Sequence, residues 1–226
     1  ANPILTLHSS RFAISASIQY FWQNFPKALS IKENILQIKL FPEEFNDVFE
    51  LQGGEQKTHS FFINFIRSEA QNNMSLDWVQ NPLAPSYSPE YCARTKAISF
   101  LVSKDINPDK DLISLVDGAI RGDNTFFKRR EIIDEYGWRN FGELYADHEA
   151  VNQKDENPLV SHYNNQYDCL YGFLFQFFQT GELKWFLMAD QLCSHIKDID
   201  IYHTKQDRLE FNNGMFWHTE HYIDAR

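Results

Sequence analysis

The spacing of apolar residues changes along the chain, and this change divides it into two parts. In the first third, apolar and polar residues tend to alternate, and β-branched and aromatic residues are frequent. Such a pattern is typical of half-buried strands, which we expect over residues 4–7, 12–20, 35–41 and 60–66. The polar stretch 50–59 contains two adjacent glycines and predicts a tight hairpin turn before the last of these strands.

Two antiparallel helices are predicted between residues 158 and 204. From 160 to 179, apolar residues surround the helix so widely that we expect most of its surface, Tyr167 and Tyr171 included, to lie in the core. Gly181 predicts the turn, because glycine readily adopts the left-handed conformation that ends a helix. Residues 183–197 have one apolar and one polar face, so this second helix is expected to be the outer one. A buried helix joined to a half-exposed partner is the repeating unit of an α/α toroid.

The region between these two parts is rich in signals that end or start helices. Residues 68–89 contain Pro82, Pro85 and Pro89, which predict a boundary within this stretch. The pair Asn107-Pro108 predicts the N-terminus of a helix that runs to about residue 120.

The predicted fold class is α+β. A β-rich segment, residues 1–66, is followed by a helical domain, residues 67–226, which holds the hairpins of an incomplete α/α toroid. The last stretch, 215–225, has the pattern of a buried helix without its outer partner. We therefore expect the chain to be a piece of a longer protein and to have little turnover by itself.

Charge and cysteine content narrow the classes of function. The chain has 21 Lys and Arg against 31 Asp and Glu, a net charge of −10, and it shows no basic face for phosphate contacts, so we expect no nucleic-acid partner. No apolar run approaches a membrane span in length, so no membrane partner is expected. The three cysteines have no paired spacing and predict neither a disulfide framework nor a zinc site. No cofactor is predicted, and the oligomeric state and cellular location stay open.

Polar side chains gather in four segments, 138–149, 162–168, 198–203 and 218–221. Each lies at or just before a predicted helix end, and the inner helices of a toroid run alike, so we expect the four segments to meet on one face. Helix N-termini also carry unpaired N–H groups that favour anions. We do not predict a metal site, although His148-Glu149 and the pair His218 and His221 are of suitable types, because such pairs are common.

Several of these segments resemble a known family. The runs GWRNFGELYADHE (137–149), SHYNNQYD (161–168), TGELKWFLMADQL (180–192), DIDIYHT (198–204) and FWHTEHY (216–222) are similar to those of large bacterial carbohydrate-active proteins grouped with the exo-acting rhamnogalacturonan lyases. The run ELQGGEQKTH (50–59) resembles the strand-rich barrel domain that precedes their α/α toroid. The resemblance spans residues 48–226. It implies a polysaccharide or oligosaccharide partner and lyase activity on a uronic-acid-containing polysaccharide.

The residue types permit this chemistry and two alternatives. Elimination at a uronic acid needs a group that neutralises the carboxylate, a base for the C5 proton and an acid for the leaving oxygen. The catalytic candidates are His162, Tyr163, Arg139 and His148. The residues predicted to contact substrate are Asn164, Asn165, Trp138, Asp168, His203, His218, Glu220 and His221. A glycoside hydrolase would instead need two carboxylates about 5–9.5 Å apart.

The carboxylates available to such a hydrolase are Asp147, Glu149, Asp168, Asp200 and Glu220. They lie in the same polar segments as the lyase candidates. The sequence therefore predicts where a site lies more sharply than it predicts which reaction takes place there. Glycan binding without turnover is the third possibility.

Overall fold

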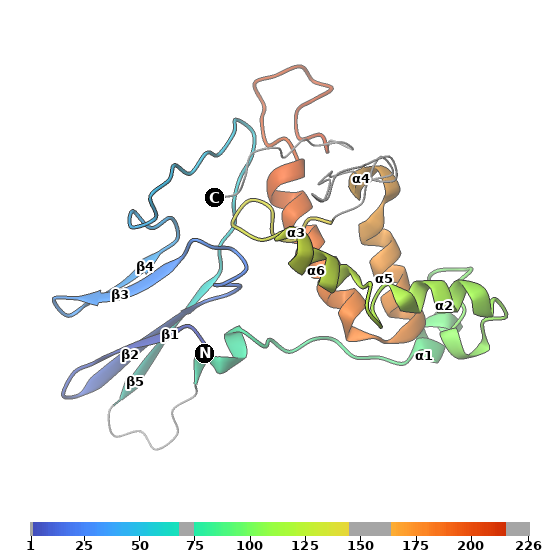
Figure 1. Ribbon diagram of the computed structural model, residues 1–226, viewed down its shortest axis with the longest axis horizontal. Helices are drawn as coiled ribbons and strands as arrows, with labels where there is room; N and C mark the ends of the chain where they lie inside the picture. The colour runs from blue at the N-terminus through green and yellow to red at the C-terminus, as the bar shows by residue number, and fades with distance from the viewer. Residues whose placement is uncertain (1, 68–74, 145–163, 216–226) are drawn as a thin grey trace.

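A computed structural model describes residues 2–67, 75–144 and 164–215 of the chain. Antiparallel strands come first and helices follow, with the strands on one side of the molecule and the helices on the other (Figure 1). The predicted α+β class, with a β-rich N-terminal segment followed by helices, is confirmed.

The strands form two small antiparallel sheets. The first has the order β1 (Ile4–His8), β2 (Phe12–Ile18), β5 (Phe61–Arg67), and the second pairs β3 (Ala28–Lys32) with β4 (Ile35–Lys39). Strand β3 was not predicted from the sequence. It is joined to β4 by Glu33 and Asn34, both with positive φ of 51° and 62°, as in the two-residue turns whose twist matches a hairpin.

The stretch 50–59 is not a hairpin turn, because β4 and β5, the strands before and after it, belong to different sheets and do not pair. It runs instead to the helical side, where the backbone N–H of Gln56 donates to the carbonyl of Asp198 at 2.9 Å and the N–H of His203 donates to the carbonyl of Gly54 at 2.7 Å. Gly54 has φ of 92°, and a Cβ there would lie 2.1 Å from the Tyr202 ring. Glycine is therefore required for the backbone to pass under this ring.

The helices follow the strands along the chain, and several of them begin with a polar cap. They are α1 (Pro89–Thr95), α2 (Lys110–Gly118), α3 (Phe126–Ile133), α4 (Asn164–Tyr167), α5 (Cys169–Thr180) and α6 (Leu183–His195), with short turns η1 (Leu76–Val79), η2 (Lys104–Ile106) and η4 (Ile196–Asp200), the last a π-helical turn. Ser88, Asp109 and Thr125 each accept a hydrogen bond from a backbone N–H of the first helical turn. The cap of α2 is therefore Asp109 rather than the predicted Asn107.

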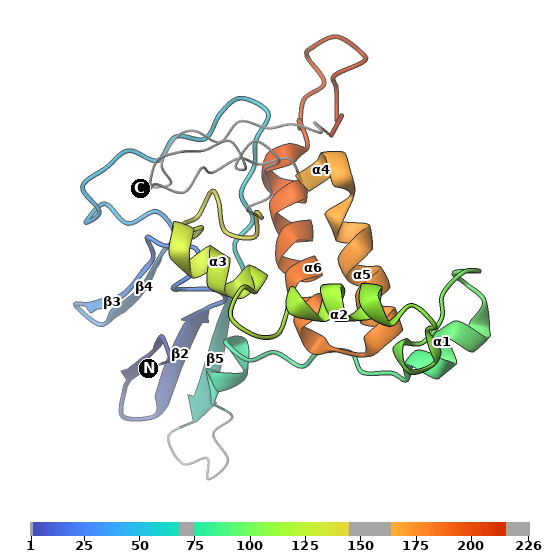
Figure 2. The same cartoon turned by 45° about the vertical axis from the view of Figure 1, so that its right-hand side comes forward.

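Helices α5 and α6 form the predicted antiparallel hairpin and lie side by side in both views (Figures 1 and 2). Gly181 closes it with φ of 70°, and its N–H donates to the carbonyl of Phe177 at 2.8 Å. The core between them joins both helices to α2 and the loop before residue 145. Its buried members include Ile120, Leu144, Phe173, Phe177, Trp185, Met188 and Leu192. Within the residues that the structure describes, α5 and α6 thus form one helical hairpin of the kind that is repeated in an α/α toroid.

The predicted order of burial within the hairpin is wrong. Helix α6 lies nearer to the strands than α5 does (Figure 2), and it has five buried residues, whereas α5 has three. Tyr167 and Tyr171, expected in the core, are 55% and 47% exposed. The amphipathic helix is the inner one here.

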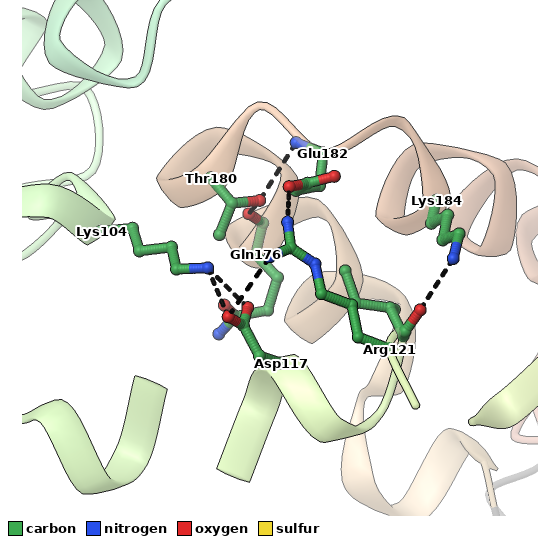
Figure 3. Close-up of polar contacts among 8 residues, drawn as sticks. Lys104, Asp117, Arg121, Gln176, Thr180, Glu182 and Lys184 are labelled. Atoms are coloured by element: carbon green, nitrogen blue, oxygen red, sulfur yellow. Dashed lines mark hydrogen bonds and ion pairs between the residues drawn. The ribbon is translucent and has the colours of Figure 1, made fainter. Parts of the chain in front are cut away.

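Polar contacts hold the α5–α6 turn against the segment just after α2, and a further pair joins α2 to the short helix η2 (Figure 3). Lys104 Nζ lies 2.7 Å from Asp117 Oδ1, and the Arg121 guanidinium pairs with Glu182 in the turn itself. The Lys184 ammonium donates to the carbonyl of Ile120 at 2.9 Å. The turn is thus fixed by charges at its surface as well as by the apolar core beneath it.

We expect Leu192→Ala to lower the free energy of unfolding by about 2–5 kcal/mol, because the side chain is fully buried in the hairpin core and its removal leaves a cavity. The matched control is Leu115→Ala on α2, where the side chain is 75% exposed and the loss should be about 0.5 kcal/mol or less. Urea unfolding of both variants measures the difference. Equal losses would show that the core has been placed wrongly.

Candidate functional site

The loop 137–144 joins the strands to the hairpin. The N–H groups of Gly137 and Trp138 donate to the carbonyls of Gln23 and Phe25, each at 2.8 Å. On the other side, Gly142 has φ of 106°, and a Cβ there would lie 2.3 Å from the carbonyl oxygen of Gln191 on α6. Only glycine permits this approach of loop and helix.

Two residues predicted for the site are buried in this loop. The Arg139 guanidinium donates to the carbonyl of Glu50 at 2.9 Å and pairs with the Glu55 carboxylate, and the two side chains are 3% and 10% exposed. The Trp138 ring packs edge-on against Phe41, with ring centroids 5.3 Å apart. Both side chains thus attach the loop to the stretch 41–55, and their roles toward a substrate stay predictions.

A chain of buried polar groups connects three of the four segments that were expected to meet. Asn165 Nδ2 donates to Asp200 Oδ2 at 2.9 Å. His195 Nε2 lies 3.6 Å from Asp200 Oδ1 and 2.9 Å from Glu143 Oε2. The side chains of His195, Asp200 and Glu143 are each at most 1% exposed. We call Glu143, His195 and Asp200 the buried triad.

The charge on the buried triad follows from its contacts. Burial by itself lowers the pKa of His195, but the neighbouring carboxylates of Glu143 and Asp200 outweigh burial and raise this pKa to about 10. The two carboxylates therefore favour the protonated form of the imidazole at neutral pH. The donor atoms of the three residues also lie within 4.8 Å of one another, which makes them able to hold a metal ion.

The remaining predicted site residues are placed as follows. Asp168 is the N-cap of α5 and accepts from the N–H of Tyr171 at 3.4 Å. His203 Nε2 lies 2.6 Å from the carbonyl oxygen of Lys197. Asn164 begins α4, and Asn165 belongs to the polar chain described above. His148, His162, Tyr163, His218, Glu220 and His221 lie outside the described residues, as do Asp147 and Glu149.

A polar cleft of about 170 Å³ opens where the sheet meets α6. The segment after β2 lines it with Gln19, Tyr20 and Asn24, the segment before β5 with Lys57, Thr58, His59 and Ser60, and the loop 137–144 with Phe141. The hairpin side is lined by Asp190, Gln191, Ser194, Lys197 and Asp198. We call this concavity the junction cleft.

Asp198 fixes one wall of the junction cleft. Its carboxylate accepts the backbone N–H of Thr58 at 2.7 Å and the Thr58 hydroxyl at 2.9 Å. The side chain is 2% exposed and lies 3.6 Å from Lys197 Nζ. Because these bonds hold the backbone at residue 58, they also set the positions of Lys57 and His59 on either side of it.

The titratable groups of the junction cleft are strongly perturbed. Burial lowers the pKa of Lys57 to about 8, against the opposing effect of Asp198. Burial, with the nearby cations of Lys27 and Lys57, lowers the pKa of His59 to about 4. Burial and the Asp190 carboxylate raise the pKa of Tyr20 to about 12. Near neutral pH the cleft therefore presents a neutral imidazole, a protonated phenol and a lysine cation.

Two polar atoms of cleft residues have no hydrogen-bond partner among the described residues. They are Asn24 Oδ1, in a side chain that is 8% exposed, and His59 Nε2. A buried polar atom without a partner costs about 1–3 kcal/mol. Such atoms in a concavity are a reason to expect a ligand or ordered water there.

Sequence reasoning missed the junction cleft. Lys57 and His59 stand in a run that was noted for its resemblance to a barrel domain, but no chemistry was assigned to them. Tyr20, Asn24 and Asp190 gave no signal, because nothing in their local sequence distinguishes a cleft residue from a surface residue. Buried polar atoms become visible only once the strands and the hairpin are in contact.

Comparison with known proteins adds no family assignment. No protein-family model matches the chain, and a search of curated proteins finds no significant match. Among the described helices, none combines the length and apolar character that a membrane crossing requires. The resemblance to rhamnogalacturonan lyases thus stays an expectation from the sequence.

We expect Arg139→Met to lower the free energy of unfolding by about 3–5 kcal/mol, because it leaves the buried Glu55 carboxylate without its cation. The double variant Arg139→Met/Glu55→Gln should lose less than the single variant, since it leaves no buried charge unpaired. Arg121→Met is the control, because this guanidinium is half exposed and its pair should contribute about 1 kcal/mol or less. Chemical denaturation gives all three values. A loss for Arg139→Met as small as the control's would contradict the structural role.

Proposed function

We propose that the protein is carbohydrate-active, that the junction cleft binds the uronic acid unit of a polysaccharide, and that the reaction is β-elimination. The observation that carries the proposal is the group of Lys57, His59 and Asn24 in a concavity with room for one sugar-sized unit. Perturbed titratable groups in a cleft are a common mark of a functional site. The resemblance noted in the sequence favours the same substrate class.

The cleft offers both a charge and hydrogen bonds to a carboxylated sugar. Lys57 is partly desolvated, and Lys197, whose side chain is half exposed, lines the same cleft from the hairpin side. A carboxylate between these ammonium groups would gain charge-assisted hydrogen bonds, which are about twice as strong as neutral ones. Asn24 Oδ1 and His59 Nε2 have capacity for sugar hydroxyl groups, which donate and accept.

The same groups are of the types that elimination needs. With the carboxylate neutralised, the C5 proton becomes more acidic, and the neutral imidazole of His59 can take it. The C4–O bond then breaks, a double bond forms between C4 and C5, and the leaving oxygen takes a proton from an acid such as the Tyr20 hydroxyl. General acids and bases of this kind contribute roughly 10²–10⁴-fold each to a rate.

The test is a panel of polysaccharides and oligosaccharides, with and without uronic acids, incubated with the chain. The ultraviolet absorbance of the unsaturated uronate reports elimination, and new reducing ends without that absorbance report hydrolysis. Calorimetry on the same panel reports binding without turnover. Elimination confirms the whole proposal and contradicts the expectation of little turnover by this chain alone, whereas hydrolysis overturns the lyase reaction. Binding alone supports only the ligand class, and the absence of any interaction with uronic acids overturns the proposal.

We expect Lys57→Met to weaken the binding of an oligogalacturonate by about tenfold or more, since a hydrogen bond to a charged group contributes about 1.5–3 kcal/mol. Lys32→Met is the matched control, because Lys32 lies exposed at the end of β3, outside the cleft. Calorimetric titration measures both affinities. A loss of affinity of the same size in the control would refute the placement of the carboxylate, and thermal unfolding checks that the two variants fold alike.

The affinity should fall as the pH rises through about 8, where Lys57 loses its proton. The groups that face this ammonium are Asp198, Lys197, Lys27 and His59, and His59 is already neutral over this range. Since the folded pKa lies below the ordinary value of 10.5, the unfolded chain binds more protons between about pH 8 and 10.5. Stability contributed by this group therefore rises with pH as ligand affinity falls. In Lys57→Met the fall in affinity should disappear, and its persistence would exclude Lys57 as the cause.

A further inference from the structure

We propose that the buried triad, Glu143, His195 and Asp200, is a binding site for one divalent transition-metal ion, with Zn²⁺ as the best-fitting ion. The site lies apart from the residues that line the junction cleft. The inference does not depend on the proposed carbohydrate chemistry.

The spacing of the donor atoms fits a common centre. His195 Nε2 lies 2.9 Å from Glu143 Oε2 and 3.6 Å from Asp200 Oδ1. Nitrogen and oxygen ligands lie about 2.1 Å from Zn²⁺, so two of them lie about 3.4 Å apart in a tetrahedral site. The two observed separations bracket this value. The donor atoms of all three residues lie within 4.8 Å of one another, close enough for one ion to contact them all.

Each carboxylate has one oxygen occupied and one turned to the centre. Asp200 Oδ2 accepts from the Asn165 amide at 2.9 Å, while Oδ1 faces His195. Glu143 Oε1 accepts the backbone N–H of Leu144 at 3.0 Å, while Oε2 faces His195. Outer hydrogen bonds that orient the ligating carboxylates in this way are a regular part of metal sites.

The burial and chemical type of the three residues also suit an ion. All three side chains are at most 1% exposed, and two carboxylates with an imidazole are ligands that transition-metal ions take in proteins. The imidazole nitrogen suits Zn²⁺ better than it suits Mg²⁺ or Ca²⁺.

The backbone at the triad supplies an independent observation. Asp200 is the last residue of the π-helical turn η4, which directly continues α6 after His195. π-Helical turns are rare in proteins, and those that do occur are often found at functional sites. Here the turn brings Asp200 back toward His195, five residues earlier in the chain, where a plain α-helix would place neighbours at three and four residues.

The test begins with the wild-type chain, freed of any affinity tag, stripped with a chelator and dialysed against Zn²⁺. Elemental analysis should give one Zn²⁺ per chain, and the thermal unfolding midpoint should rise with Zn²⁺ concentration. Ca²⁺ at the same concentration should have a much smaller effect. Replacement by Co²⁺ should give the visible absorption of a nitrogen and oxygen site.

Variants then locate the ion. His195→Gln and Asp200→Asn should lose stoichiometric Zn²⁺, while His8→Gln and Glu210→Gln, at exposed positions in β1 and in the stretch after η4, should keep it. If the triad variants do not fold, Asn165→Ala removes only the outer hydrogen bond to Asp200 and should weaken Zn²⁺ binding about 10–100-fold. Wild-type protein that binds no Zn²⁺ at micromolar concentration would overturn the proposal. So would full Zn²⁺ occupancy and unchanged affinity in whichever of these variants folds.

Discussion

The Asp198 carboxylate is the contact on which the arrangement of the two halves depends. It is buried, it belongs to the end of the hairpin, and it accepts both donors of Thr58 from the strand side. A buried carboxylate is tolerated only when its oxygens are hydrogen-bonded, so the strand side and the helical side are specified in one relative position. The junction cleft is the space left beside this contact. The shape of the cleft therefore depends on the hydrogen bonds between the Asp198 carboxylate and Thr58.

Much of the fold could be predicted from the sequence because it depends on local patterns. Alternation gave four strands, and helical periodicity with Gly181 gave the hairpin and its turn. Strand β3 was missed because it is five residues long and is defined by its pairing with β4 across a turn with positive φ. The order of burial in the hairpin was wrong for a related reason. The polar face of α6 carries Asp190, Gln191 and Ser194, which line the junction cleft, and a polar face in sequence does not show whether it faces open solvent or a cleft between two parts of the molecule.

The site could be predicted only as a region. Three of the four polar segments do meet, but Glu143 and His195, which carry two of the contacts, were not chosen. Glu143 and His195 are 52 positions apart, and a glutamate and a histidine at that distance give no pattern in a single sequence. Arg139 and Trp138 were predicted to act on substrate because of their chemical types. In the structure both side chains are buried in contacts between the loop 137–144 and the stretch 41–55. An arginine is as suited to a buried ion pair as to a substrate carboxylate.

The turn η4 has a consequence for how this region tolerates change. The Asp198 side chain contacts the strand side, whereas the Asp200 side chain contacts His195 and Asn165. Two acidic residues separated by a single residue thus have different partners. Successive residues of a helix are rotated by about 100° around its axis. Deleting one residue from this turn would swing the second acid away from its partners while leaving the composition nearly the same. The length of the turn, more than the identity of its apolar residues, is therefore the property that an insertion or a deletion would damage.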